Sequence, residues 1–304
     1  MLKDKGDVLE KNKIKSLPEF IEQVCSLNDK YTGGGRYCAY ELLYRGQSDA
    51  KYELLPSIAR GRTSSIQVTT LNEERNLIEL AKKKFPDVFN DNMKPLEVLA
   101  LLQHYGVPTR LLDITENALV ALFFACNKPG VDGEVFVFAN SDNHVDTAPI
   151  INAIADTCRL TRGCEYPLEY FQKAALNQSY FIEHKHIFEI CNEFPVEDWI
   201  ERCCSKVQFV HATTHTLRQQ LQQGRYILFP NEIVGEGKDM AFDTIIKPLD
   251  KDNDCIVKKF VIDGNFKGKI LRDLKSCGIC RSTLFSDSLD EACKGIVEQV
   301  QRWL

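Results

Sequence analysis

Residues 114–126 constrain the fold of this chain more than any other part of its sequence. Apolar side chains occupy every side of a helix in this stretch: Ile114, Ala118, Leu119, Val120, Ala121, Leu122, Phe123, Phe124 and Ala125. A helix that is apolar on all sides belongs in the interior of a protein. We therefore predict a buried central helix that Asp113 caps, with Glu116 completing a capping box, and that ends at residues 128–130.

The polar residues 103–113 lead directly into this predicted helix. Polar loop residues held by a rigid scaffold are a common place for binding and chemistry. Thr109 and Arg110 stand just ahead of the helix, where a phosphate would be favoured. An Arg110–Asp113 pair is the alternative, and the spacing slightly favours it. His104 and Tyr105 are candidates for contacting a ribose or a base, or else pack against each other.

The composition is that of an ordinary globular protein, with 44% hydrophobic and 27% charged residues. No run of eighteen apolar residues is present, so we predict no membrane-spanning helix. The charged N-terminal residues do not resemble a signal peptide, and a cytoplasmic protein is expected. The net charge of −5 argues against broad binding to nucleic acid but leaves a local basic groove open.

The twelve cysteines are expected to be mostly reduced thiols. Cys277 and Cys280 have the spacing of metal ligands, and a composite zinc site would need further ligands from far upstream. The candidates for those ligands are Cys203, Cys204, His211 and His215. Because no second closely spaced pair follows Cys280, buried thiols are favoured and we predict no metal.

Hydrophobic periodicity predicts one α+β domain over residues 17–304, preceded by a flexible N-terminus at residues 1–16. Helices are predicted at 17–27, 70–85, 95–104, 267–277 and 289–304. Strands are predicted at 41–47, 134–138, 207–210, 225–229, 244–246 and 255–262. Residues 140–205 are predicted to be mainly helical, as an insertion into the domain.

Arginines carry the clearest indication of a binding site. Arg45 stands near a strand end beside Gly46, which would let a ligand approach the backbone. Its guanidinium could fork two hydrogen bonds to a phosphate or carboxylate. A salt bridge to a nearby acid is an equally good interpretation. Gln222, ahead of a strand, could hold a hydroxyl but could not act as a base, and Arg218 is a further anion-binding candidate.

Four segments of the sequence together resemble the FRG domain, which is named for a Phe-Arg-Gly motif. These are Tyr-Arg-Gly-Gln at 44–47, Leu-Leu-Pro-Ser at 54–57, Gln-His-Tyr-Gly-Val-Pro-Thr-Arg-Leu-Leu-Asp at 103–113 and Ala-Leu-Val-Ala-Leu-Phe-Phe-Ala at 118–125. Further similarity at 218–224 and 279–290 extends the resemblance over roughly residues 38–295. Tyr44, Ile114 and Ser286 replace the usual Phe, Trp and Pro, and the missing Trp would change a pocket wall.

The order of the segments is similar to that of ADP-ribosyltransferases. Such enzymes place an Arg or His on a first strand, a Ser/Thr or Tyr motif in mid-domain, and a Glu or Gln before a late strand. Arg45, the segment containing Thr109 and Thr115, and Gln222 follow that order. By this fold-level analogy, we expect a split, mainly antiparallel sheet of ADP-ribosyltransferase-like type with a buried central helix and a helical elaboration.

The analogy implies that NAD is the substrate. The expected catalytic residues are Arg45, His104, Tyr105 and Gln222, and the expected NAD-binding residues are Arg45, Gly46, Gln47, Thr109, Arg110 and Arg218. Such a site acts by positioning and electrostatics on an oxocarbenium-like transition state. Gln at position 222 favours an acceptor that brings its own nucleophile, or binding without catalysis.

The resemblance implies an effector in bacterial or phage defence, or a toxin. Its expected partners are NAD, a macromolecular acceptor such as an RNA, and a neutralising antitoxin or chaperone, with no membrane. Two alternatives remain at this point. One is an effector that binds or cleaves nucleic acid with the same arginines, and the other is a non-catalytic module that binds a ligand.

Overall fold

The computed structural model describes residues 13–32, 40–60, 69–140, 144–145, 149–161, 167–184, 196–213 and 216–285. The strands are β1 (Lys13–Ile14), β2 (Glu41–Gln47), β3 (Leu111–Thr115), β4 (Gly133–Asn140), β5 (His144–Val145), β6 (Gln208–His211), β7 (Gly224–Leu228), β8 (Ile233–Val234), β9 (Ala241–Phe242) and β10 (Ile256–Ile262). The α-helices are α2 (Leu17–Thr32), α3 (Thr70–Lys84), α4 (Pro95–His104), α5 (Ala118–Cys126), α6 (Pro149–Ala155), α7 (Thr157–Leu160), α8 (Leu168–Leu176), α9 (Ser179–Ile182), α11 (Val196–Cys204), α12 (Leu217–Leu221), α13 (Lys267–Ser276) and α14 (Arg281–Leu284). Short 3₁₀ turns lie at Ser57–Ala59 and Gly237–Asp239.

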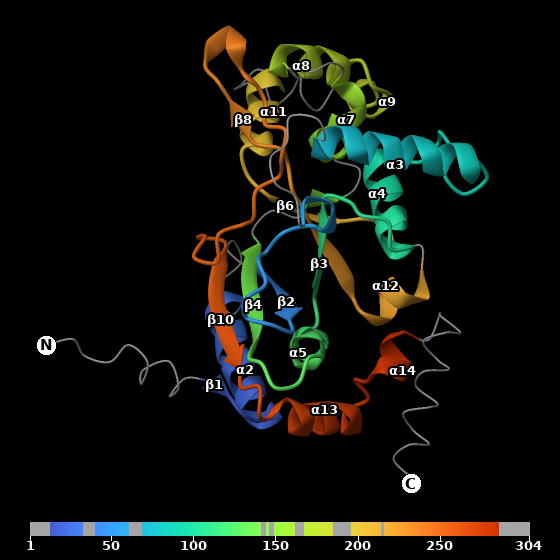
Figure 1. Ribbon diagram of the computed structural model, residues 1–304. Coiled ribbons are helices and arrows are strands. Elements are labelled where there is room, and N and C mark those ends of the chain that lie inside the picture. The colour runs from blue at the N-terminus through green and yellow to red at the C-terminus, as the bar shows by residue number, and fades with distance from the viewer. Residues whose placement is uncertain are drawn as a thin grey trace, which may run out of the picture.

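One eight-stranded sheet organises the fold, in the order β1-β10-β4-β2-β3-β7-β6-β5, beside a small β8-β9 ribbon (Figure 1). The pairs of the large sheet are antiparallel except at its ends, where β1 pairs with β10 and β5 with β6 in parallel. The prediction of a mixed fold of helices around a mainly antiparallel sheet is therefore confirmed.

The large sheet is nearly divided between β2 and β3. One registered pair, Tyr44 opposite Thr115, joins these two strands. By contrast, β2 pairs with β4 over seven residues and β3 pairs with β7 over five. Arg225 adds a polar connection across this boundary, because its guanidinium donates to Glu41 on β2 at 3.0 Å and to Glu116 after β3 at 2.9 Å.

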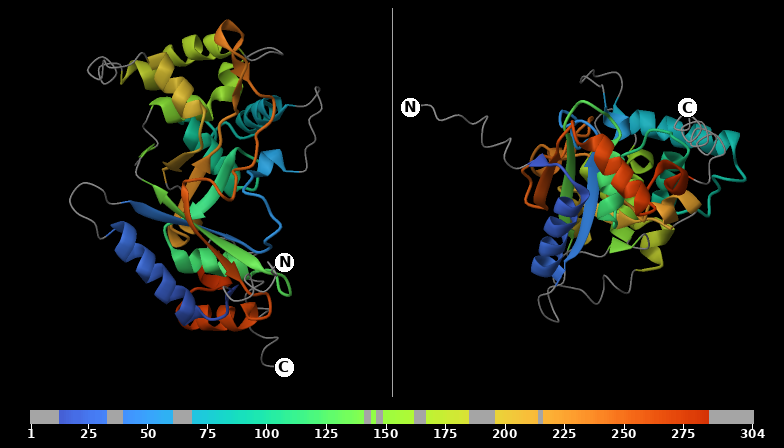
Figure 2. Two further views of the ribbon diagram at one scale, coloured as in Figure 1. Left: turned by 90° about the vertical axis from the view of Figure 1, so that its left-hand side faces the viewer. Right: turned by 90° about the horizontal axis from the view of Figure 1, so that it is seen from below.

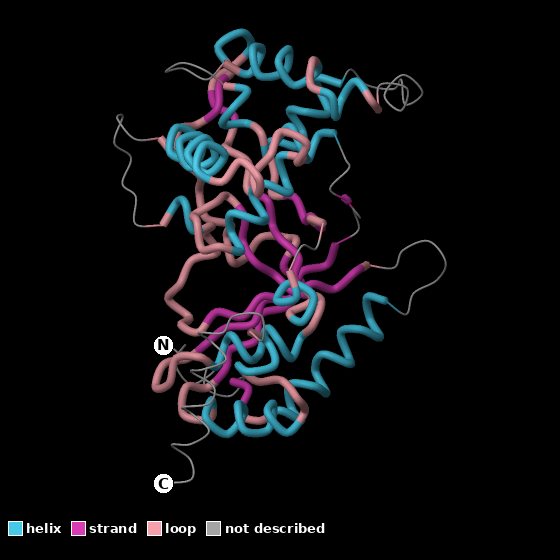
Figure 3. Tube along the Cα trace, turned by 90° about the vertical axis from the view of Figure 1, so that its right-hand side faces the viewer, coloured by secondary structure: helices cyan, strands magenta, loops and turns pink. Residues whose placement is uncertain are grey.

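Separate groups of helices cover the two halves of the sheet. Helices α2, α5 and α13 pack on the half formed by β2, β4 and β10, which lies in the lower part of the left view of Figure 2. Helices α3, α4, α6, α7, α8, α9 and α11 gather around the half formed by β3, β7 and β6, as the tube view shows (Figure 3). A third apolar cluster, which includes Leu43, Leu112 and Phe136, fills the space beside both halves.

The predicted central helix is confirmed as α5, in which Val120, Ala121, Leu122 and Ala125 are fully buried. The expected capping by Asp113 is wrong, because residues 111–115 form strand β3. The cap is instead Asn117, whose side-chain oxygen accepts hydrogen bonds from the backbone N–H groups of residues 119 and 120.

Gly46 lets α5 pack against β2. A Cβ atom at this position would lie 1.8 Å from the carbonyl oxygen of Ala121 and 2.8 Å from the backbone nitrogen of Ala125. Only glycine fits such a close backbone approach. The absence of a side chain at Gly46 thus accommodates a helix, whereas the sequence had suggested that it accommodates a ligand.

Most predicted elements are present with small changes at their ends. Helix α4 coincides with its prediction, and α3 ends one residue early. The helices expected within residues 140–205 appear as α6, α7, α8, α9 and α11. The strand predicted at 244–246 is wrong, since residues 244 and 245 form a bend and residue 246 has no regular structure. The helix predicted at 289–304 lies outside the described residues, and so do residues 1–12 of the flexible N-terminus predicted at 1–16. Residues 13 and 14 of that segment are instead paired with β10 as strand β1.

Among the described residues, no helix combines the length and the apolar character needed to cross a bilayer.

Candidate functional site

Three adjoining hollows open where β2 and β3 separate. The split pocket has a volume of about 180 Å³ and is lined by Arg45, Asp113, Thr115, Arg218 and Gln222. The outer pocket, of about 580 Å³, shares Arg45, Gly46 and Phe124 with it and adds Lys51, Tyr52 and Arg60. The inner pocket, of about 100 Å³, shares Asp113, Arg218 and Gln222 with the split pocket and adds His104 and Tyr226. The combined space is of the size that small-molecule ligands occupy in proteins.

Arg45 reaches across the division between the two strands. Its Nη1 donates a hydrogen bond to the backbone carbonyl of Asp113, while its buried Nε has no hydrogen-bond partner among the described residues. Burial and the like charge of Arg60 lower the pKa of Arg45 to about 10, against the opposing effect of the Asp113 carboxylate. The guanidinium is therefore charged at neutral pH, but neighbouring groups balance its positive charge only in part.

Two predicted neighbours of Arg45 also line the outer pocket. Gly46 does so next to α5, whose Phe124 lines the same pocket. Gln47 is buried, and its Nε2 donates to the carbonyl of Glu53 at 3.0 Å. The buried Oε1 of Gln47 has no hydrogen-bond partner among the described residues. The amide of Gln47 is therefore incompletely satisfied in the wall of the outer pocket.

Helix α12 brings Arg218 and Gln222 to the same place. Gln222 is half-buried at the C-terminal end of α12, and its Nε2 donates to the carbonyl of Leu284 at 3.1 Å. The backbone carbonyl of Gln222 accepts a 2.6 Å hydrogen bond from the hydroxyl of Thr115. The guanidinium of Arg218 lies over the ring of Phe285, 4.6 Å from its centroid. These contacts hold α12 and the end of β3 together around the split pocket.

His104 and Tyr105 are placed differently from each other. His104 is half-buried and lines the inner pocket, with its Nδ1 3.3 Å from the hydroxyl of Thr216. Tyr105 is 65% exposed and lines none of the three pockets, although its ring meets that of His104 edge-on at 5.1 Å. His104 therefore belongs to the pocketed region, and Tyr105 lies beside it on the surface.

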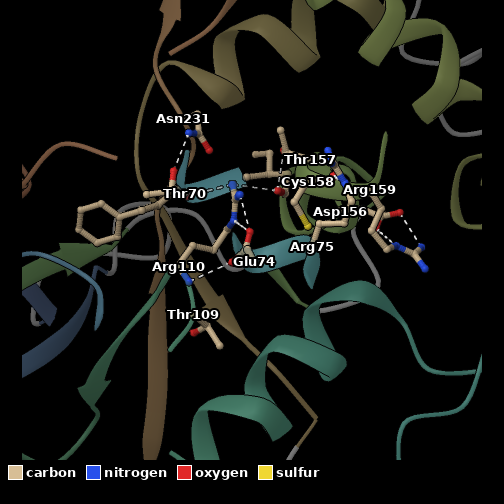
Figure 4. A network of polar contacts seen from close by, with 12 residues as sticks. Thr70, Glu74, Arg75, Thr109, Arg110, Asp156, Thr157, Cys158, Arg159 and Asn231 are labelled. Atoms are coloured by element: carbon tan, nitrogen blue, oxygen red, sulfur yellow. Dashed lines mark hydrogen bonds and ion pairs between the residues drawn. The ribbon is translucent and has the colours of Figure 1, made fainter. Parts of the chain in front are cut away.

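Thr109 and Arg110 are in the core and line none of the three pockets, so the structure does not place them with the other predicted NAD-binding residues. Arg110 is fully buried, with its Nε and Nη2 donating to Glu74 at 2.7 and 2.6 Å (Figure 4). Burial works to lower the pKa of Arg110, but the Glu74 carboxylate outweighs it and the pKa of Arg110 is raised. The alternative pairing of Arg110 with Asp113 is wrong.

Thr109 has a structural role of the same kind. Its side chain is fully buried, and its hydroxyl donates to the Oε1 of Gln103 at 2.7 Å while accepting from the backbone N–H of Leu111 at 3.1 Å. The residues Thr109 and Arg110 precede a strand and not the start of a helix. The threonine that does reach the split pocket is Thr115.

Asp113 is the site residue that sequence reasoning missed as a functional candidate. It is exposed in a strand whose other four residues are buried, and its Oδ2 accepts a 3.0 Å hydrogen bond from the Nε2 of Gln103. It lies opposite Tyr226 in the β3–β7 register. An exposed carboxylate at the centre of a buried strand is the signal that could have found it.

Other features offer weaker sites. A hollow of about 390 Å³ near Gln208, Lys247 and Cys255 contains none of the predicted site residues. Among the described residues, no three His, Cys, Asp or Glu side chains are grouped so as to hold a metal ion. The eight cysteines within those residues carry free thiols.

A comparison with protein families matches residues 40–133 to the FRG domain. The match includes β2 with Arg45, the segment 103–113 and all of α5, but it ends before Arg218 and Gln222. It is thus shorter than the range of 38–295 that the sequence suggested. A search of curated proteins and a search of solved structures gave no significant match. Residues 40–133 of this chain therefore match the FRG domain.

Proposed function

We propose that this protein binds NAD across the three adjoining pockets and transfers the ADP-ribose group to an acceptor. One observation carries the proposal. Arg45, Thr115 and Gln222 are far apart in the sequence, yet they come from or directly precede β2, β3 and β7, which are neighbours in the sheet. All three line the split pocket. This is the order of parts in which an ADP-ribosyltransferase-like site would be assembled.

The charge distribution supports an anionic substrate. Arg45 lines both the outer and the split pocket, Arg60 and Lys51 line the outer pocket, and Arg218 lines the split pocket. A diphosphate beside Arg45 would compensate a guanidinium that burial leaves costly to keep charged. The outer pocket, which also contains Tyr52 and Phe124, has the volume to take the nucleoside part of a dinucleotide.

The proposed reaction needs little covalent chemistry from the protein. Breaking the bond between nicotinamide and the ribose produces positive charge on the ribose, and catalysis comes from orientation and from polar groups aimed at that charge. Gln222 would hold a ribose hydroxyl, because an amide can donate and accept a hydrogen bond but takes no proton near neutral pH. His104, in the inner pocket, would lie on the nicotinamide side.

The test uses the purified full-length chain with NAD labelled in its adenylate phosphate and a cell lysate as the source of acceptors. We expect release of nicotinamide together with transfer of the label to a macromolecule. The Arg45→Ala variant should lose both signals. Arg272→Ala should retain them, because Arg272 is an exposed arginine of α13 that lines none of the three pockets.

Two outcomes would reject the proposal. The first is wild-type protein that neither binds NAD nor releases nicotinamide. The second is degradation of RNA or DNA in the same lysate without consumption of NAD, which would favour an effector acting directly on nucleic acid. Binding of NAD with no turnover under any condition would point to a ligand-binding module.

A further inference from the structure

We propose that Asp113 is the general base of the transfer reaction, the role that Gln222 cannot fill. This inference rests on the proposed function and extends it to the chemical class of the acceptor. A carboxylate can remove a proton, whereas an amide cannot. The acceptor would therefore carry its nucleophile as an O–H or N–H group that must lose a proton, and water would be the simplest such acceptor.

The position of Asp113 makes it the residue available for this role. Of the described residues that line the split and inner pockets, Asp113 is the one carboxylate, and it lines both. Arg218 and Gln222 also line both pockets, so the carboxylate shares its surroundings with the groups proposed to hold NAD. Arg45 donates to the backbone carbonyl of the same residue.

The side chain of Asp113 is held in a defined orientation. The Nε2 of Gln103 donates to its Oδ2 at 3.0 Å, and the Gln103 amide is itself fixed because its Oε1 accepts from the hydroxyl of Thr109 at 2.7 Å. Within the described residues, the carboxylate receives its hydrogen bond at Oδ2. Such a chain of contacts from the core orients a catalytic group without covering it, and Asp113 remains exposed.

His104 is the competing candidate for a base. It lines the inner pocket but not the split pocket where Arg45, Gly46 and Thr115 lie, and its Nδ1 is near the Thr216 hydroxyl. The carboxylate has a further advantage that the imidazole lacks. Its negative charge would stabilise the positive charge that develops on the ribose as nicotinamide leaves.

The proposed step balances in atoms and charge. The bond between C1′ of the ribose and the nicotinamide nitrogen breaks, and its electron pair leaves with nicotinamide, which becomes neutral. The acceptor oxygen or nitrogen forms a new bond to C1′. The proton of that O–H or N–H group moves to the Asp113 carboxylate and is then released to solvent. The reaction requires no oxidant, reductant or additional reactant.

The experiment measures hydrolysis of NAD, with water as the acceptor, and the Kd for NAD of each variant. Asp113→Asn should lower kcat by about 10²–10⁴-fold, the usual contribution of a general base, while the Kd for NAD changes by less than about threefold, which is below 1 kcal/mol. Asp87→Asn is the matched control, because Asp87 is an exposed aspartate that lines none of the three pockets. It should behave as wild type.

Chemical rescue separates a base from a structural residue. Added formate should raise the rate of NAD hydrolysis by Asp113→Ala at least tenfold, because a free carboxylate can enter the vacated space. It should not raise the rate of Arg45→Ala. Full activity of Asp113→Asn, or a loss that formate leaves unchanged, would overturn the assignment of Asp113 alone. If His104→Gln lost NAD hydrolysis while Asp113→Asn kept it, the general base would be His104. Wild-type protein that neither binds nor hydrolyses NAD would overturn the proposed function and this inference together.

Discussion

Arg110 and Glu74 form an ion pair that is removed from solvent, with 2.6 Å between the Nη2 of the arginine and the Oε2 of the glutamate. The pair joins the start of β3 to helix α3, thirty-six residues earlier in the chain. The Nη1 of Arg110 also lies 3.4 Å from the carbonyl oxygens of Ile154 and Phe229. The buried side chain of Arg110 thus connects the start of β3 to helix α3, to helix α6 and to the residue that follows β7.

We predict that Glu74→Gln destabilises the protein by about 3–5 kcal/mol, because it leaves the Arg110 charge buried without its counter-ion. Urea denaturation followed by circular dichroism would measure the change in the free energy of unfolding. Glu79→Gln, an exposed position on the same helix, is the control and should change it by less than about 0.5 kcal/mol. Equal stability of Glu74→Gln and wild type would show that burying the Arg110 charge without its counter-ion costs little free energy.

A second prediction concerns Gly46. Gly46→Ala should destabilise the protein by at least about 1–3 kcal/mol, the usual cost of overpacking, because the new Cβ would overlap the carbonyl oxygen of Ala121. The matched substitution is Gly268→Ala in α13, where the nearest atom to the new Cβ is an arginine nitrogen at 4.0 Å. The thermal unfolding midpoint should fall for the first variant and hold or rise for the second. Equal midpoints would mean that α5 can move away from β2.

The thiols should differ in the pH at which they react. Burial raises the pKa of Cys280, but hydrogen bonds from Ser282 and Thr283 outweigh it, so the pKa lies below the ordinary value. Burial raises the pKa of Cys126 to about 12 and of Cys255 to about 11. Since the thiolate is the nucleophile, its fraction rises as the pH passes the pKa. Iodoacetamide should therefore modify Cys280 at a lower pH than Cys255, and Cys126 last.

Mass spectrometry of peptides after alkylation at a series of pH values would give the rate at each cysteine. Cys280→Ser should remove the earliest of these three modifications and leave the pH dependence at Cys255 unchanged. Alkylation of Cys126 at neutral pH in the folded protein, as fast as that of Cys280, would contradict the burial on which this ordering depends.

The fourth prediction separates charge from geometry at Arg45. Arg45→Ala should weaken NAD binding by about ten- to hundredfold, since charge-assisted hydrogen bonds contribute about 1.5–3 kcal/mol. Arg45→Lys should weaken NAD binding almost as much, because an ammonium keeps the positive charge but loses the planar, two-pronged hydrogen-bonding geometry of the guanidinium. Calorimetric titration with NAD, paired with a thermal melt, gives both quantities. A large fall in melting temperature with binding reduced only in proportion would make Arg45 a structural residue.

Much of the fold could be predicted from the sequence where a segment had strong periodicity. The ends of α4 and the burial of α5 followed from the pattern of apolar residues alone. The start of α5 did not, because a polar residue before an apolar run resembles a helix cap whether it stands in a strand or a turn. Asp113 stands in a strand, and Asn117 is the cap.

The site was harder to predict because tertiary contacts decide between equivalent local patterns. Sequence spacing pairs Arg110 with the nearby Asp113, but folding places Glu74 against it instead. Arg45, Arg218 and Gln222 line one pocket, as expected of a common site, although nothing in the sequence gives their distance. Asp113 was hidden by its apparent role as a cap.

The Tyr44–Thr115 pair has a mechanical consequence. Within the described residues, it is the one registered contact between the ladder of β2, β4 and β10 and the ladder of β3, β7 and β6. A small rotation about it would widen or narrow the split pocket while every other pair in each ladder stayed intact. If the two ladders turned relative to each other about this pair, the width of the pocket would change with the angle between them, and a ligand contacting both would hold that angle fixed.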